Sequence, residues 1–396
     1  MSRIVVTGIG IITALGDTAE ENRSALQQGK TGIGRARFFE SRYTKTLPLA
    51  EINISTEALA EKLHIDPLAA TRTDLLALHS ARQAIADAQW SNETLQSSKT
   101  ALIGASTVGG MCLTDEMYAD ANATSSNGSG YLQSYSNSAN TSFLQQQFNV
   151  KGIVNTFNTA CSSSANAIMY GARLIRNGMA DRAIVGGVDS LSKYTVNGFN
   201  ALMILSDQLC RPFDVERKGL NLGEGAAFLI LEKEEGALEK NKYAVVAGYG
   251  NSNDAFHPSS TSAEGEGPYL SMKRALDSAR LQPGNIDFIN AHGTATENND
   301  ETESVAMQRL FETVPEFAST KSYTGHTLGA AGAVEAVYSI LSLQHQEVYP
   351  SLHFEKEIET TKLTPVVSYN KRDLSHIMSN SFGFGGNCTS LIFSKV

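Results

Sequence analysis

The sequence lacks the features that mark several classes of protein. Its four cysteines form no C-x-x-C pair and show no zinc-like clustering with the eight histidines, so we expect no bound metal. No apolar run is long enough to cross a membrane. A net charge of −9, which no block of lysine and arginine reverses locally, argues against a nucleic-acid-binding surface. These absences favour a protein with free thiols in a reducing compartment, the cytoplasm.

The N-terminal apolar segment, residues 4–12, carries no targeting or cofactor signal. It is β-branched, broken by glycines and lacks a small-residue cleavage site, so it predicts a buried strand and not a signal peptide. Gly8-x-Gly10 hints at a dinucleotide loop, but Thr13 stands where the third glycine belongs. We therefore expect no dinucleotide there.

What the sequence does contain is the alternation of an α/β protein. Its 396 residues, 41% hydrophobic, suffice for one large core or two similar domains. Buried strands and amphipathic helices alternate, which predicts a sheet covered on both faces. The helical pattern of residues 55–88 is interrupted at Pro67, and strands are expected at residues 100–104, 181–187 and 223–231. The charged segment 233–242 separates two predicted halves, residues 1–240 and 241–396.

Cys161 lies in the most informative stretch, residues 158–165. An extended apolar segment precedes it, and apolar residues with helical spacing follow it at Ala165, Ile168, Met169, Ala172 and Ile175. A cysteine at a strand-to-helix turn lies near unpaired backbone N–H groups and the positive end of the helix dipole, which favour thiolate over thiol. We expect a nucleophile for covalent catalysis; a buried, inert cysteine is the alternative.

The second half repeats this design. Residues 322–336 are a polar turn followed by a helix rich in small residues, as at Cys161. Two halves of similar design would bring His326 opposite Cys161. His292 and Lys321 also lie in small-residue surroundings, and the four side chains together indicate a catalytic site.

Four motifs in order then define a resemblance: Thr159-Ala160-Cys161-Ser162-Ser163, Ala291-His292-Gly293-Thr294, Lys321-Ser322-x-Thr324-Gly325-His326 and Gly383-Phe384-Gly385-Gly386. From Val5 to its last strand the chain resembles the β-ketoacyl-acyl-carrier-protein synthases, the elongating Cys-His-His condensing enzymes. The resemblance implies the thiolase fold, with two pseudo-symmetric βαβαβαββ halves in five α-β-α-β-α layers, and a dimer.

The resemblance also implies roles for these residues. Cys161 would accept an acyl group from a carrier-protein thioester, and a malonyl unit would lose CO₂ to give the carbanion that attacks it. His292 and His326 would donate Nε–H groups to the malonyl thioester oxygen, while the backbone N–H groups of Cys161 and Phe384 would form an oxyanion hole. No cofactor is implied.

Supporting residues follow from the same resemblance. Lys321 would be a structural cation paired with Glu303, or with both Glu303 and Asp300, in the family's arrangement, and Phe384 would be a gate that swings aside for the acyl chain. Asn290, Glu335 and Ser379 match positions where the family can hold a structural monovalent cation, a site we treat as optional. The acyl pocket is expected at Val108, Met111, Phe199 and Leu220.

The chain departs from most relatives near the pocket. Asn387-Cys388 follows the glycine-rich gate where relatives have Thr-Asn, Leu220 replaces a phenylalanine, and residues 297–300 lack the usual proline and glycine. We therefore hypothesise a specialised pathway, such as polyunsaturated or aryl-polyene-type chains, in place of bulk fatty-acid synthesis.

Two rival functions remain open. A thiolase shares the fold and uses a second cysteine in a C-terminal loop, near the place of Cys388, but the His292 motif favours decarboxylative condensation. A non-catalytic chain-length-factor subunit would have lost the nucleophile, and Cys161 is intact. The chain is thus expected to be the active subunit of a homodimer or of a mixed dimer with a chain-length-factor-like partner.

The acyl carrier protein is the expected partner. Carrier proteins are acidic and so is this chain, so docking must depend on a few basic side chains near the pocket mouth. Arg72, Lys62, Arg211 and Lys218 are the candidates by family position.

Overall fold

The computed structural model describes residues 3–109, 111–123 and 134–396. Its main sheet has ten strands in the order β3-β2-β4-β5-β1-β6-β12-β11-β7-β8. The strands are β1 Ile4–Thr13, β2 Thr100–Ala105, β3 Val154–Phe157, β4 Arg182–Asp189, β5 Gly225–Lys233, β6 Ala244–Asn253, β7 Phe288–Asn290, β8 Glu316–Ala318, β11 His376–Phe382 and β12 Asn387–Ser394. A small antiparallel pair joins β9 Glu347–Val348 to β10 Asn370–Lys371.

The two ends of this sheet repeat one pattern. In the first half β3, β2 and β4 are parallel, and β5 and β1 follow antiparallel. In the second half β8, β7 and β11 are parallel, and β12 and β6 follow antiparallel. The halves meet where β1 pairs with β6, at Val5↔Val245 and Val6↔Ala244. The predicted α/β class is confirmed, although the halves share one continuous sheet.

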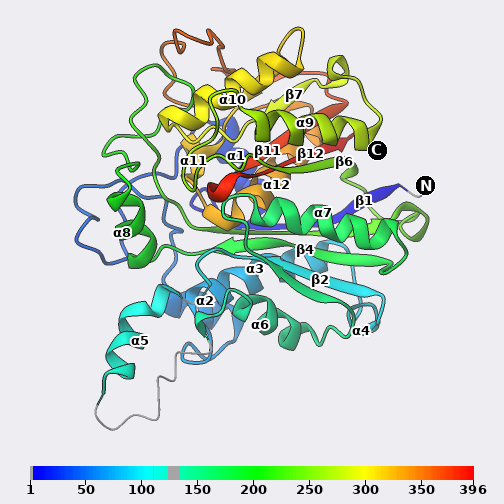
Figure 1. The fold of residues 1–396 in the computed structure, drawn as a ribbon. Coiled ribbons are helices and arrows are strands. Elements are labelled where there is room, and N and C mark those ends of the chain that lie inside the picture. Colours follow the sequence, from blue (N-terminus) through cyan, green and yellow to red (C-terminus); the bar gives the residue numbers. More distant parts are fainter. Residues whose placement is uncertain (1–2, 110, 124–133) are drawn as a thin grey trace.

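Helices cover both faces of each half (Figure 1). The helices are α1 Ala19–Gln27, α2 Thr56–Leu63, α3 Arg72–Asp87, α4 Asn92–Gln96, α5 Thr114–Ala121, α6 Ala139–Phe148, α7 Ser163–Arg176, α8 Lys193–Ala201, α9 Glu266–Ala279, α10 Glu297–Leu310, α11 Lys321–Thr324 and α12 Ala331–His345. α3 packs on β1 and β5, α9 packs on β6 and β12, and α7 and α12 lie together between the halves. The five layers are therefore α3, the first half-sheet, α7 with α12, the second half-sheet and α9. Among the described residues, no helix is both long and apolar enough to span a membrane.

The predicted helical and strand segments agree with these elements. Pro67 lies between α2 and α3, and the predicted division at residues 240/241 falls between β5 and β6. We retain that division as a proposal for the boundary between two units.

Small residues let the two central helices approach closely. Residues 331–343 of α12 are all buried. A Cβ on Gly332 would lie 2.7 Å from the backbone nitrogen of Ala165 in α7. Gly332 at the start of α12, packed against Ala165 at the start of α7, thus sets the spacing of the middle layer, on which the site is built.

Gly332→Ala is therefore expected to lower the free energy of unfolding by about 1–3 kcal/mol, because the added methyl overpacks a contact with backbone. Urea unfolding followed by far-UV circular dichroism measures it. The matched control is Gly198→Ala in α8, where a Cβ has open space; it should be neutral or stabilise by up to about 1 kcal/mol. Equal effects of the two changes would contradict this account of the packing.

Candidate active site

Cys161 lies in the turn between β3 and α7, as predicted. It is 6% exposed, and Ala160 before it has φ 53°, a left-handed conformation that alanine rarely adopts. The helix begins at Ser163, and its N-cap Ser162 makes no side-chain capping bond. The strained turn therefore places the sulfur beside the uncapped N-terminus of α7.

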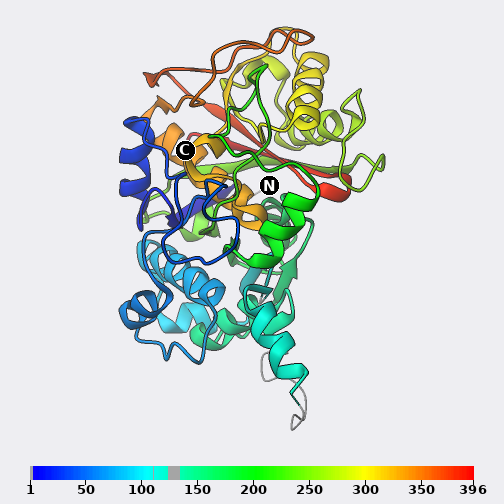
Figure 2. The same cartoon turned by 90° about the vertical axis from the view of Figure 1, so that its left-hand side faces the viewer.

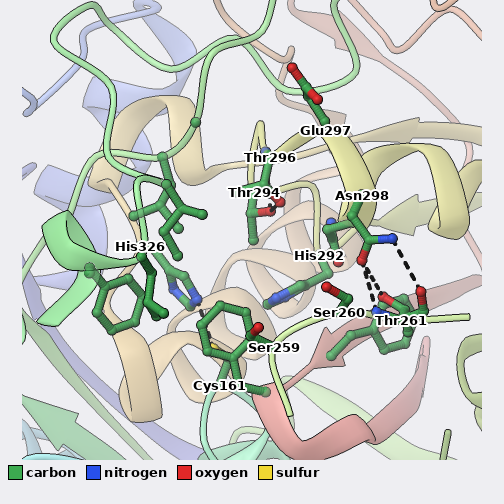
Figure 3. A pocket seen from close by; sticks show the side chains of 18 of the residues that line it. Cys161, Ser259, Ser260, Thr261, His292, Thr294, Thr296, Glu297, Asn298 and His326 are labelled. Carbon is green, nitrogen blue, oxygen red and sulfur yellow. Dashed lines mark hydrogen bonds between the residues drawn. The ribbon is translucent and has the colours of Figure 1, made fainter. Parts of the chain in front are cut away.

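Both histidines face this sulfur. His326 lies between β8 and α12, the position in the second half that corresponds to Cys161 in the first. Its Nε2 is 2.9 Å from Cys161 Sγ. The Sγ of Cys161 and one ring nitrogen of each of His292 and His326 all lie within 4.8 Å of one another, and Figure 3 shows the two rings converging above the cysteine. The structure thus brings His326 opposite Cys161, as the similar design of the two halves predicts.

The tautomer of each ring follows from its other nitrogen. The backbone N–H of Leu328 donates to Nδ1 of His326 over 3.2 Å. Nζ of Lys321, which can only donate when protonated, is 3.3 Å from Nδ1 of His292. A nitrogen that accepts carries no proton, so each neutral ring has its proton on Nε2 and points an N–H donor into the site.

Lys321 is buried and is not paired as expected. It donates to the carbonyl oxygen of His292 over 2.6 Å and forms an ion pair with Glu335. Glu303 instead accepts the backbone N–H groups of His292 and Gly293, both at 2.9 Å. The expected pairing of Lys321 with Glu303 is therefore wrong, because that carboxylate is turned to the backbone of the His292 loop.

Asp300 is also not a partner of Lys321. It accepts the backbone N–H of Phe213 over 2.7 Å and that of Ala295, a residue with φ 64°. Asp300 and Glu303 thus both hold the loop that follows β7. The loop positions His292, and the two carboxylates are positioning groups.

Burial sets the charge states of the reacting groups. Desolvation, and then the charge of Lys321, hold the pKa of His292 and that of His326 well below the usual 6.5. Both rings are therefore neutral donors at pH 7. Burial also raises the pKa of the Cys161 thiol to about 11, although Lys321 and the backbone N–H of Phe384 oppose the rise. The expectation that backbone N–H groups and the helix dipole favour the thiolate over the thiol is thus wrong for the free enzyme, because desolvation outweighs them.

The arrangement of Cys161, His292 and His326 also resembles a metal ligand set. A metal would require an unprotonated Nε2 on each ring, whereas both carry protons there, so these residues do not fit one. A separate group of buried oxygen atoms does fit a cation. Asn290 Oδ1 and Glu335 Oε2 are buried with no hydrogen-bond partner among the described residues, and Ser379 pairs with Asn290 across β11 and β7. This oxygen set fits the optional monovalent cation.

The predicted gate lies over the cysteine. Phe384 stacks on Phe199 with 5.9 Å between ring centroids. Its neighbours Gly385 and Gly386 have φ of 80° and 82°, which favour glycine. The backbone N–H of Gly385 donates to the carbonyl of Pro258 over 2.7 Å, so the gate is tied to the loop of residues 257–262.

Asn387 does not contribute a free polar group to the gate. Its Oδ1 accepts from Ser162 Oγ, Asn166 Nδ2 and Asn251 Nδ2 at 2.8–3.0 Å. This departure from the family's pattern therefore ties the gate loop to the start of α7 and to β6, and it has no direct access to an acyl chain.

Cys161 opens into a cavity of about 400 Å³. Figure 3 shows polar side chains lining this cavity around His292. They are Ser259, Ser260, Thr261, Thr294, Thr296 and Asn298. Sequence analysis missed this wall. Thr294 and Thr296 alternate along the segment after His292, a signal that could have been used, whereas nothing local places residues 259–261 at the site.

The four predicted acyl-pocket residues share one apolar cluster. Val108, Met111, Phe199 and Leu220 pack there with Val196 and Leu328. Phe199 and Leu220 line the 400 Å³ cavity, whereas Met111 lines a second cavity of about 900 Å³ that does not reach Cys161. Val108 lines neither cavity, so only Phe199 and Leu220 of the four predicted residues lie at the cavity that holds Cys161.

Three of the four predicted docking residues are engaged in ion pairs. Arg72 is held by Glu224, Lys62 by Asp17, and Arg211 by Asp214 and Glu355. Arg72 also donates to two backbone carbonyls, so its role is to fix the start of α3. Lys218 is exposed on the rim of the 400 Å³ cavity and makes no ion pair with a described residue.

No second cysteine reaches the site. All four cysteines are free, and Cys388 is buried in β12 with its thiol donating to the carbonyl of Gly386. Burial raises the pKa of Cys388 further than that of Cys161. The proton-transferring cysteine that a thiolase needs is absent from the residues lining the cavity.

A cysteine at a helix start, faced by two imidazole donors across a twofold-repeated sheet, defines a condensing enzyme of the thiolase type. Sequence comparison agrees. Residues 1–237 match the beta-ketoacyl synthase N-terminal domain and residues 243–355 match the C-terminal domain. The chain belongs to the β-ketoacyl synthase family.

Named relatives cover the whole chain. It is 34% identical to 3-oxoacyl-[acyl-carrier-protein] synthase 2 of Rhizobium meliloti, over 100% of this chain and 99% of the relative, and 32% identical to the enzyme of the same name from Coxiella burnetii, with the same coverage. The solved ishigamide ketosynthase/chain length factor has a TM-score of 0.93 at 28% identity, covering 100% of this chain and 99% of that one. A ketosynthase solved in complex with its chain length factor from Xenorhabdus doucetiae has a TM-score of 0.86 at 30% identity, covering 100% and 98%. The predicted thiolase fold is confirmed.

The raised pKa of Cys161 makes its alkylation strongly dependent on pH. A thiol with a pKa of about 11 has a thiolate fraction that grows about tenfold per pH unit below that value. The rate constant for iodoacetamide on Cys161, followed by intact-protein mass spectrometry, should therefore rise steadily from pH 7 to pH 9. A plateau below pH 8 would show that the donors around the sulfur outweigh burial.

Proposed function

We propose that this chain elongates carrier-bound acyl chains by decarboxylative condensation. The observation that carries the proposal is the convergence of Cys161 Sγ with two imidazole N–H donors within 4.8 Å. A second imidazole donor is what decarboxylation of a malonyl unit requires and thiolysis does not. The names of the curated relatives, 3-oxoacyl-[acyl-carrier-protein] synthases, support the same reaction.

The first half-reaction uses Cys161. The thiol of Cys161 gives up its proton as Sγ attacks the acyl thioester carbonyl, the carrier sulfur leaves and takes up a proton, and the acyl group is carried on Sγ. The backbone N–H groups of Cys161 and Phe384 lie against the sulfur and would stabilise the negative oxygen of the tetrahedral intermediate.

The second half-reaction uses the histidines. Nε2–H of His292 and of His326 donate to the malonyl thioester oxygen while the C–CO₂ bond breaks and its electron pair passes to the α-carbon. That carbon attacks the acyl-cysteine carbonyl, and the thiolate of Cys161 leaves. The product is a β-ketoacyl group on the carrier, and Lys321 keeps the His292 tautomer that the step requires.

We also propose that the chain works as the active subunit of a dimer, with a second copy or a chain-length-factor-like subunit. Its intact Cys161 supports the active role. The Xenorhabdus doucetiae ketosynthase, solved with its chain length factor, supports the mixed form.

His292→Ala and His326→Ala should each reduce condensation by about 10²- to 10³-fold, the effect of losing one oxyanion donor. Acylation of Cys161 should fall less, since His292 takes no part in it. Single-turnover acylation by mass spectrometry and condensation with malonyl-loaded carrier measure the two steps separately, and Cys161→Ala is the control that abolishes both. Equal loss of both steps in a folded His292→Ala variant would contradict this division.

We further propose a specialised, conjugated acyl substrate. Leu220 is buried beside Phe199 on the cavity wall, where it takes the place of a flat aromatic ring. A rigid polyenoyl or aromatic chain cannot coil, so it benefits most from the space that the smaller side chain leaves.

Leu220→Phe should then slow turnover of polyenoyl substrates more than that of saturated ones, by a difference of about 1–3 kcal/mol in activation free energy. Ratios of kcat/KM for matched polyenoyl- and saturated acyl-carriers of equal length give this difference. Leu222→Ile, a buried change in the same cluster, controls for general disturbance of the packing. A wild-type preference for saturated chains would contradict the proposal.

A further inference from the structure

Positive charge gathers in one exposed segment of this acidic protein. Residues 34–48, here the basic segment, contain Arg35, Arg37, Arg42 and Lys45 against Glu40 as the single acid. All four basic side chains are exposed. None of them forms an ion pair among the described residues, in contrast to Lys62, Arg72 and Arg211.

The basic segment is held in a defined conformation although it contains no helix or long strand. Gly34 pairs with Leu49 at its base. The carboxylate of Glu51 accepts the backbone N–H groups of residues 37, 38 and 39. Phe39, Tyr43 and Leu47 pack against the apolar cluster that includes Leu220. These three side chains face inward, whereas Phe38 is 45% exposed beside the charges. The charges thus face solvent from a fixed backbone.

The basic segment packs beside α8, next to the catalytic cavity, and its residues Phe38, Phe39 and Glu40 line the second cavity of about 900 Å³. Asn200 of α8 donates to the hydroxyl of Tyr43 over 3.1 Å, and its neighbour Phe199 lines the cavity and stacks on Phe384. Figures 1 and 2 show the blue segment next to the green helix α8 on one side of the molecule. Leu202 and Met203, which follow α8, line the cavity and are 49% and 88% exposed.

We propose that the basic segment is the surface on which the acidic carrier protein docks. This inference rests on the proposed function, because it assumes a carrier-bound substrate. Unpaired arginine and lysine side chains attract an acidic partner, and exposed Leu202 and Met203 offer apolar contacts at the cavity mouth. Lys218 on the rim adds a fifth positive charge on the approach to Cys161.

The test is the double variant Arg35→Glu/Lys45→Glu, since neither side chain makes a hydrogen bond or ion pair with a described residue. Its Kd for acyl-carrier protein, measured by fluorescence anisotropy at several salt concentrations, should rise about five- to tenfold with a weaker salt dependence. Its kcat/KM for an acyl N-acetylcysteamine thioester, which has no protein and no phosphate, should stay within about twofold of wild type.

Two control variants separate charge at this place from charge in general. Lys273→Glu/Lys371→Glu changes the net charge equally at exposed positions of α9 and β10, and it should alter the carrier Kd by less than about twofold. Arg35→Lys/Lys45→Arg keeps both charges and should bind as wild type. An unchanged carrier Kd in the reversed variant, or equal weakening in the α9/β10 control, would overturn the docking surface.

Other outcomes show whether the docking surface or the proposed function is wrong. If the reversed variant loses acyl-coenzyme A as strongly as acyl-carrier, the segment recognises the phosphate that both share, and protein docking is refuted. If wild-type enzyme elongates N-acetylcysteamine thioesters but no carrier-bound substrate, the proposed function fails before the docking surface is tested. If wild-type enzyme elongates carrier-bound substrate and the reversed variant binds the carrier as tightly as wild type, the docking surface is refuted and the proposed function stands.

Discussion

The site depends on one buried cation. Lys321 is 2% exposed, and its three donors are taken by Glu335, by the carbonyl oxygen of His292 and by Nδ1 of the same ring. Full pairing is what makes a buried ammonium tolerable. The last contact fixes the His292 tautomer, and the positive charge adds to desolvation, the larger cause, in lowering the pKa of both histidines. Lys321 therefore helps to keep both imidazoles neutral and fixes the donating tautomer of His292, while the backbone N–H of Leu328 fixes that of His326. Neutral N–H donors are what a site that stabilises an oxyanion requires.

The repeated half explains why these groups meet. Cys161 ends the β3-to-α7 connection, and His326 ends the corresponding β8-to-α12 connection. Because α7 and α12 lie against each other in the middle layer, their starts approach each other across the pseudo-twofold axis. Close packing at Gly332 and Ala165 keeps the helices near enough for a direct contact between His326 and the sulfur. The spacing of the middle layer is thus a constraint on catalysis as well as on stability.

The sequence predicted what local pattern and repetition determine. The turn at Cys161, the helix break at Pro67 and the meeting of Cys161 with His326 follow from motifs and from the similarity of the halves. The partner of Lys321 could not be predicted, because Glu335 and Glu303 are both acids near the motifs and only the packed loop shows which one faces the backbone. The prediction that Cys161 favours the thiolate was wrong for a related reason, because desolvation depends on how Phe384 and the histidines enclose the sulfur. The basic segment escaped notice because its charges alternate with aromatic and polar residues and form no block.

The charge distribution gives the molecule an orientation toward an acidic partner. With a net charge of −9, most of the surface repels such a partner over roughly the ~8–10 Å Debye length of physiological salt. Attraction of the acidic partner by the basic segment then favours encounters in which the substrate carried by that partner already faces Phe384. On the proposed docking surface, repulsion elsewhere suppresses unproductive encounters, so the acidic body contributes to specificity together with the basic segment. A uniformly basic surface would bind an acidic partner more often, but it would not select the face from which Cys161 can be reached.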